Sequence, residues 1–247
     1  MNAAEYANLE AMEREHWYYS GKRALVCHWL AAAKALAPEK TLLDCGAGTG
    51  LFAEEMAAHC RVLVLDDHDE SLQLLRKRFS PGQVLRVSAT GIPLPDGAVD
   101  AITALDVLEH IEDDRAAVRE MHRVLRPGGV LVATVPASMA LWSDWDVALH
   151  HFRRYDRTGL RALFPDPAAW EIVHVNYTNV LVFPVVWTVR KWRAWRRSAP
   201  AGGNRRSEDV VPPAWLNALL RALFVATGRV RVPFPFGVSL LLVARRR

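Results

Sequence analysis

The sequence predicts an α/β fold in which a mostly parallel sheet carries helices on both faces. Two observations support this prediction. Short apolar runs alternate with helical segments between residues 41 and 136, and a glycine-rich stretch follows the first run directly. Alternation of this kind builds right-handed crossovers and therefore parallel strands. A further apolar run near the C-terminus predicts a final strand, which we expect to be antiparallel.

Length and composition fit a single compact domain and argue against extensive disorder. The chain has 247 residues, of which 51% are hydrophobic and 23% are charged. Such a chain can bury a sizeable core. The formal net charge is +4, but residues 190–197 and 245–247 hold much of the excess. This distribution indicates a local basic patch and argues against a nucleic-acid binder.

The alternation divides the single domain into four parts. Residues 1–38 form an N-terminal helical cap with helices over 5–17 and 21–36, and Pro38 ends the second helix. Residues 39–136 form the core, 137–168 a lid insertion, and 169–247 the C-terminal strands with helices rich in Trp and Arg. Stretch 198–209 has the composition of a loop. The expected strands are 41–44, 61–66, 83–87, 98–105, 129–135, 170–177 and 237–244, giving seven in all, and the last two pair with each other.

Cysteine usage and the apolar segments point to a cytoplasmic protein. The three cysteines show no CxxC pair, so neither a disulfide framework nor a zinc ribbon is expected. The first residues are polar and acidic, unlike a secretory signal. The apolar stretch 180–189 is too short to span a bilayer. Segment 181–197 joins an apolar half to a half rich in Trp and Arg, so peripheral membrane contact and a solvated helix end both stay open.

The most specific motif is the stretch 42–50, Leu-Leu-Asp-Cys-Gly-Ala-Gly-Thr-Gly. A phosphate-binding loop would need a Gly-Lys-Ser/Thr ending, and a dinucleotide loop would need glycine at 51, where Leu51 stands. The pattern Asp-x-Gly-x-Gly-x-Gly fits at every fixed position and resembles class I S-adenosylmethionine-dependent methyltransferases of type 11/12, with a Rossmann-like sheet. The resemblance implies S-adenosylmethionine as cofactor, contacted by Asp44, Gly46, Ala47, Gly48 and Gly50.

Later strand ends extend this expected cofactor site. Asp66 closes the second strand, where a carboxylate can accept hydrogen bonds from both ribose hydroxyls, and Asp67 is the neighbouring alternative. Residues 88–95 resemble the family segment that holds the adenine, which implicates Ala89 and Thr90. The usual acidic residue of that segment is a serine here, at Ser88. Asp106, after the fourth strand, is expected beside the cofactor as well.

The run Asp106-Val-Leu-Glu109-His110 stands at the strand end expected beside the methyl group. It resembles the acidic-x-x-Glu-His motif of ubiquinone-biosynthesis and small-RNA 2′-O-methyltransferases. That resemblance implies a divalent cation, Mg²⁺ or another, held by Asp106, Glu109, His110 and a later histidine. His150 is favoured for the last place over His151. The alternatives are a structural role for the Glu-His pair, or His110 or His150 as a base without a metal.

The insertion supplies candidate acceptor-binding residues. Aromatic and basic side chains gather there, with arginines suited to an acidic group, although lid packing would explain them equally well. These candidates are Trp142, Trp145, Arg153, Arg154 and Tyr155. Residues 15–19 could similarly close over the cofactor or pack in the core.

We therefore expect an enzyme that methylates the hydroxyl of a small-molecule or lipid-like acceptor. C- or N-methylation without a metal is the alternative within enzymes. An NAD(P)-dependent oxidoreductase is disfavoured by Leu51, and RNA methylation by the lack of a recognisable RNA-binding module. A non-catalytic methyltransferase-like membrane-docking or partner subunit is disfavoured by the intact acidic and glycine positions.

Overall fold

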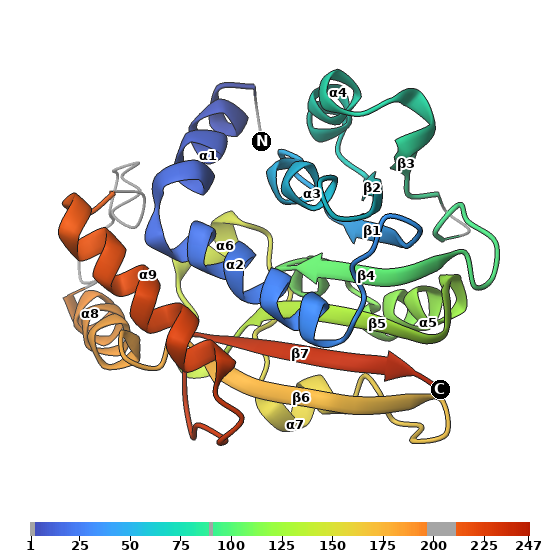
Figure 1. The fold of residues 1–247 in the computed structure, drawn as a ribbon. Coiled ribbons are helices and arrows are strands. Elements are labelled where there is room, and N and C mark those ends of the chain that lie inside the picture. The colour runs from blue at the N-terminus through green and yellow to red at the C-terminus, as the bar shows by residue number, and fades with distance from the viewer. Residues whose placement is uncertain (1–2, 89–90, 197–210) are drawn as a thin grey trace.

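The computed structural model describes residues 3–88, 91–196 and 211–247. Seven strands form one sheet in the order β3-β2-β1-β4-β5-β7-β6 (Figure 1). Strands β1 to β5 run parallel, whereas β7 is antiparallel to both β5 and β6. The predicted fold class is confirmed, and so is the pairing of the last two strands. Their bounds are β1 Thr41–Cys45, β2 Arg61–Asp66, β3 Val84–Arg86, β4 Val99–Leu105, β5 Leu125–Pro136, β6 Trp170–Thr178 and β7 Ser239–Arg246.

Two apolar layers cover the two faces of the sheet. On one face α5 and α7 pack against alternate strand residues such as Leu43, Ile102 and Leu131. On the other face α2, α3, α4 and α9 pack against Leu42 and Val132. The alternation of the two sets along each strand follows from the period of two in a β-strand. The helices are α1 Ala3–Glu15, α2 Trp17–Ala32, α3 Leu51–Met56, α4 Asp69–Arg78, α5 Asp114–Val124, α6 Asp144–Ala148, α7 Arg157–Arg161, α8 Phe183–Arg196 and α9 Ala214–Arg229.

Element boundaries differ from the predictions where the backbone turns sharply. Helix α2 ends at Ala32 and not at residue 36, because Lys34 adopts a left-handed conformation with φ of 56°. Strand β5 begins at Leu125 and not at residue 129, because Leu125 already pairs with Val99 before an irregularity shifts the register. The predicted loop 198–209 lies outside the described residues.

Topology decides where a site can form. The carboxyl ends of β1, β2, β4 and β5 meet at one edge of the sheet, where ligands bind in open α/β folds. The N-terminal cap lies against this edge, because α2 packs along α9 and reaches β5. The segment between β5 and β6 returns to the same edge, where Ala137 pairs with Tyr155. Within the described residues, no helix is long and apolar enough to cross a bilayer.

Candidate functional site

The glycine loop leaves β1 in a conformation that requires small residues. Gly46, Gly48 and Gly50 all have positive φ, at 66°, 56° and 79°. A Cβ on Gly46 would lie 2.5 Å from the Val107 side chain, whereas a Cβ on Gly48 would meet no atom within 4 Å. The loop is therefore packed against Val107 at Gly46, whereas the space next to the Gly48 backbone is open. This is the geometry expected where a ligand approaches the backbone closely.

Asp66 braces this loop from the end of β2. Its carboxylate accepts hydrogen bonds from the Gly48 amide at 2.9 Å and the Ser71 hydroxyl at 2.7 Å. The amides of Asp67 and His68 donate to its other oxygen, at 2.9 and 3.1 Å. Four donors thus hold an almost buried carboxylate. The Asp67 side chain is 69% exposed and contacts His68.

Asp44, at the end of β1, is buried with one side-chain partner. The Thr103 hydroxyl donates to it at 2.6 Å. Burial raises the pKa of Asp44 to about 7, since this single hydrogen bond and the more distant charge of Lys22 do not offset desolvation. A cationic ligand group beside Asp44 would remove that cost.

Asp106 follows β4 in a left-handed conformation with φ of 57°. Lys22 from α2 donates to its carboxylate at 2.7 Å, Tyr18 at 3.3 Å and Thr134 at 3.0 Å. Burial raises the pKa of Asp106, but the Lys22 ammonium and these hydrogen bonds outweigh it, so the pKa lies below its usual value. Sequence reasoning did not identify Lys22, which lies 84 positions from Asp106.

The N-terminal cap also touches the glycine loop. Thr49 donates a hydrogen bond to the Glu13 carboxylate of α1. Burial raises the pKa of Glu13, and the bond from Thr49 and the charge of Lys22 oppose that rise. In segment 15–19, His16 is buried and caps α2, while Tyr18 donates a hydrogen bond to Asp106; closure of this segment over a cofactor stays a prediction.

A second cluster joins Glu109 and His110 to His151. One ligand atom from each residue lies within 4.8 Å of the others. The His110 and His151 rings meet edge to face, with centroids 4.6 Å apart. Glu109 is fully buried, and neither of its carboxylate oxygens has a hydrogen-bond partner in the described structure. Burial, and then the charge of Asp106, raises the pKa of Glu109 well above its usual value.

The structure brings His151, and not the predicted His150, together with Glu109 and His110. His150 takes a left-handed conformation with φ of 57° just after α6, and its side chain is exposed. The turn directs His151 inward, where its Nδ1 lies 3.0 Å from the buried Asp146 carboxylate. Asp106 is also not grouped with these three ligand atoms, because its carboxylate is engaged by Lys22 and Thr134.

The insertion residues are fastened to the protein itself. Arg154 is buried and donates to Asp146 at 2.6 Å, and the buried Tyr155 donates to Asp114 at 2.8 Å. Arg153 pairs with Asp114 at 2.7 Å. Tyr155 therefore packs the insertion, and the acidic groups met by the two arginines are internal ones. Trp142 and Trp145 are half-buried. Ala89 and Thr90, the expected adenine contacts, lie outside the described residues.

A glycine loop at the first strand end, with acidic residues at the next two, defines a Rossmann-like cofactor-binding domain. Residues 43–133 match the family described as methyltransferase domain. A probable S-adenosylmethionine-dependent methyltransferase of Mycobacterium tuberculosis is 31% identical over 137 residues, 53% of this chain and 50% of that protein. A malonyl-[acyl-carrier protein] O-methyltransferase of Serratia marcescens is 30% identical over 154 residues, 58% and 60% of the two chains.

Among solved structures, a Haloferax volcanii protein named as a methyltransferase, in complex with a methyltransferase activator, superposes with a TM-score of 0.60 and 18% identity. The alignment covers 98% of this chain and 94% of that one. The chain spans about half to three fifths of the length of the curated relatives above. Residues 43–133 thus resemble a methyltransferase domain of type 11, and the chain is similar to S-adenosylmethionine-dependent methyltransferases over about half of its length.

We predict that Asp146→Asn destabilises the protein. The change leaves Arg154 buried beside a neutral amide, and breaking a buried pair costs about 3–5 kcal/mol. Burial alone raises the pKa of Asp146, but hydrogen bonds from His151 and Arg154 lower it below its usual value. The stabilisation is thus complete above the ordinary Asp pKa of about 3.9 and is lost as pH falls through the lower folded value.

Urea unfolding of both proteins as a function of pH measures this effect. The difference in unfolding free energy should be constant at neutral pH and shrink in acid. Asp144→Asn, an exposed position in the same helix, serves as the control. Equal stability of Asp146→Asn and the native protein at pH 7 would contradict the assignment.

We also predict that Asp44→Asn separates stability from cofactor affinity. The amide oxygen can keep the bond from Thr103 while the buried charge is removed, so the unfolding free energy at pH 8 should not fall. Affinity for S-adenosylhomocysteine should fall by about tenfold or more, because a charge-assisted contact is lost. Denaturant unfolding and calorimetry check the two halves. Unchanged affinity would remove Asp44 from the site.

Proposed function

We propose that this protein transfers the methyl group of S-adenosylmethionine to a hydroxyl of a small, amphiphilic acceptor. The observation that carries this proposal is the meeting of two sites at one sheet edge. The open glycine loop and Asp44 stand on one side of Asp106, and the Glu109–His110–His151 cluster stands next to it. S-adenosylmethionine, when bound, supplies an electrophilic methyl group and leaves as a neutral thioether.

The charge balance of the loop side suits this cofactor. Burial raises the pKa of Asp44 and of Glu13, and the charge of Lys22 opposes both rises, whereas at Asp106 the Lys22 ammonium outweighs burial and the pKa is lowered. A ligand with an ammonium and a sulfonium group, but only one carboxylate, complements such a cluster of acids. We assign the cofactor's ammonium to Asp44 and Asp106 and its carboxylate to Lys22, which would then bridge the ligand and the protein. For the ribose we favour Asp67, since four protein donors already hold Asp66.

The histidine side suits deprotonation of a hydroxyl. Asp146 holds Nδ1 of His151, which orients the ring and leaves its other nitrogen for a ligand or a proton. Burial, and then the neighbouring His151, lowers the pKa of His110, so His110 is neutral and able to accept a proton near pH 7. The acceptor hydroxyl would lose its proton to this pair as its oxygen bonds to the methyl carbon.

The same three residues fit a divalent cation. A buried carboxylate without any donor, together with two imidazoles, is a mixed oxygen and nitrogen donor set that Mg²⁺, Mn²⁺, Fe²⁺ or Zn²⁺ accepts. We propose that Glu109, His110 and His151 hold it. Such an ion would lower the pKa of the acceptor hydroxyl. C- or N-methylation, the alternative, would leave this buried Glu109 without a role.

The Lys22 assignment predicts a selective loss of affinity in Lys22→Met. S-adenosylhomocysteine should bind the native protein with micromolar order affinity, roughly −8 kcal/mol. The variant should bind it about 10- to 100-fold more weakly, since a hydrogen bond to a charged group is removed. Methylthioadenosine, which lacks the amino-acid part, should bind both proteins equally. Arg14→Met, at an exposed ion pair of α1, is the control. Calorimetry that shows equal losses for both ligands would refute the carboxylate role.

The acceptor assignment predicts that Glu109→Gln and His151→Gln abolish methyl transfer and leave S-adenosylhomocysteine affinity intact. Release of S-adenosylhomocysteine with a panel of hydroxyl-bearing amphiphiles measures turnover, and mass spectrometry identifies the methyl ether. His150→Gln is the matched control, since its side chain is exposed beside the cluster. Loss of turnover in EDTA with recovery in Mn²⁺ supports the metal, and EDTA-resistant turnover supports the histidine base. Full activity in both variants would overturn the assignment.

A further inference from the structure

The first half of helix α8 is apolar, yet none of its described side chains is buried. From Phe183 to Val189 it carries only one polar side chain, Thr188, yet no described side chain from 183 to 192 is buried. Val185 is 65% exposed and Trp187 is 42% exposed. The apolar half of α8 is therefore not part of the buried core of the described residues. The helix touches the described protein mainly through Arg190, which reaches Asp146 at 3.8 Å, and through the segment 139–141.

Helix α9 continues the same apolar surface. Trp215, Leu219 and Leu223 repeat every fourth residue and so form one stripe along the helix, with Trp215 70% exposed. The turn after α9 adds Val232 and Phe236, and Phe236 contacts Phe183 of α8 with ring centroids 5.0 Å apart. Both helices lie together at one end of the molecule, away from α4 (Figure 1). Exposed apolar surface of this extent is unusual in a monomer and marks an interaction site.

The charge of this surface has one sign. No Asp or Glu occurs from residue 172 to residue 196 or from 210 to 247. Lys191, Arg221, Arg229 and Arg231 are exposed there. Exposed indole rings among cations, on two described segments that carry no acid of their own, match the interfacial zone of an anionic bilayer, where aromatic rings lie at headgroup depth and cations meet phosphates.

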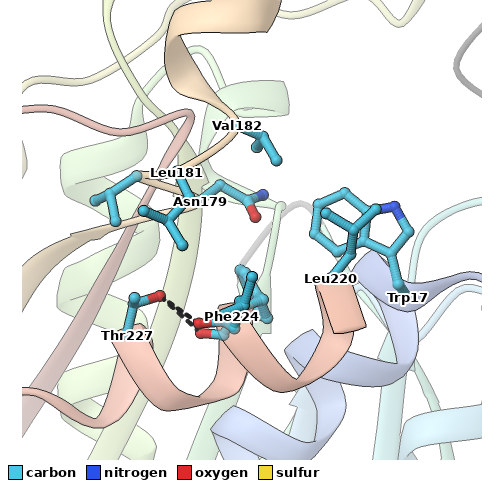
Figure 2. Close-up of a pocket in the computed structure, with 9 residues that line it drawn as sticks. Trp17, Asn179, Leu181, Val182, Leu220, Phe224 and Thr227 are labelled. Atoms are coloured by element: carbon cyan, nitrogen blue, oxygen red, sulfur yellow. Dashed lines mark hydrogen bonds between the residues drawn. The ribbon is translucent and has the colours of Figure 1, made fainter. Parts of the chain in front are cut away.

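A groove adjoins this surface, since Leu220 and Leu223 of α9 line it. It is lined mainly by apolar side chains of the α2 start, the β6–α8 connection and α9, and Figure 2 shows Trp17, Leu181 and Leu220 around it. The ≈ 240 Å³ of space between these side chains includes open solvent. Phe224, which lines the groove, packs edge to face against Tyr18 with ring centroids 5.9 Å apart, and the Tyr18 hydroxyl donates a hydrogen bond to Asp106. Asn179, also in the wall, is 6% exposed and its side-chain oxygen has no partner in the described structure.

We propose that the α8–α9 surface, defined by Val185, Trp187, Lys191, Trp215, Leu219, Arg221 and Leu223, docks on an anionic lipid bilayer. Docking would place the groove at the lipid boundary, so that an amphiphilic acceptor enters from the membrane with its apolar chain along the groove and its hydroxyl toward the Asp106 edge. The route of the acceptor rests on the proposed function, whereas the docking surface does not.

Flotation with vesicles of phosphatidylcholine alone, and of phosphatidylcholine mixed with phosphatidylglycerol, tests the docking. The native protein should float with the anionic vesicles at low salt, less at high salt, and not with the neutral ones. Each surface cation contributes about a fivefold gain in partitioning, so Lys191→Gln with Arg221→Gln should weaken it about 25-fold. Trp187→Ser with Trp215→Ser should weaken it at both salt concentrations.

Two controls keep the result interpretable. Arg76→Gln with Lys77→Gln removes the same charge from the exposed side of α4 and should float like the native protein, as should Val87→Ser at an exposed site beyond β3. Calorimetry with S-adenosylhomocysteine shows that every variant is folded. If the native protein does not bind S-adenosylhomocysteine, the methyltransferase proposal is refuted, whereas the flotation result still tests the docking surface.

Three outcomes would overturn the docking proposal. They are a native protein that stays out of the anionic vesicles at low salt, an equal loss in the α4 control, and a dimer in analytical ultracentrifugation that Trp187→Ser with Trp215→Ser dissociates while no vesicle binds. The last outcome would assign the surface to a second copy of the chain.

Discussion

The ion pair between Lys22 and Asp106 is the contact on which the site depends. A parallel sheet brings the ends of β1 and β4 to one edge, so Asp44, Asp106 and Glu109 converge there whatever else the chain does. Carboxylates gathered with little water repel one another and resist ionisation. Burial raises the pKa of Asp106, but the Lys22 ammonium and the hydrogen bonds outweigh it, so this carboxylate stays ionised. For Asp44, Glu109 and Glu13 burial dominates and the pKa stays raised, although the charge of Lys22 opposes the rise. The pKa of Lys22 itself stays high because the Asp106 carboxylate outweighs the cost of its burial.

This dependence explains why the N-terminal helices belong to the site, although the core lies elsewhere in the sequence. Lys22 and Tyr18 lie one helical turn apart on α2, so one face of the helix directs both toward Asp106. Gly21 lets Phe224 of α9 approach closely, since a Cβ there would lie 2.7 Å from the ring. Helix α9 thereby fixes the height of α2 above the sheet. The cofactor edge and the α8–α9 surface are coupled through this packing.

Sequence reasoning found the parts of the site that are encoded locally. The glycine loop and the strand-end acids Asp44, Asp66 and Asp106 each follow an apolar run directly, and the fold class followed from the same alternation. It could not find Lys22, because its contact spans 84 positions and depends on how two helices pack. The motif resemblance favoured His150 over His151. The structure differs because His150 adopts a left-handed conformation, and this turn decides which of the two adjacent side chains points inward. The hydrophobic periodicity of the sequence does not predict a single left-handed residue.

The insertion shows the same limit from the opposite side. A sequence with arginines and aromatic residues near an active site resembles an acceptor pocket. In the structure, however, Arg154 donates a hydrogen bond to Asp146 and Tyr155 donates one to Asp114. Arg154 holds the Asp146 carboxylate in place, and Asp146 in turn contacts Nδ1 of His151. Under the proposed function, the acceptor would therefore contact apolar surfaces beside the insertion more than Arg154 or Tyr155. The groove beside α9 is one, and it opens where α8 exposes apolar residues that no described element covers. An acceptor with an apolar chain is thus favoured by the part of the site that the polar residues leave vacant.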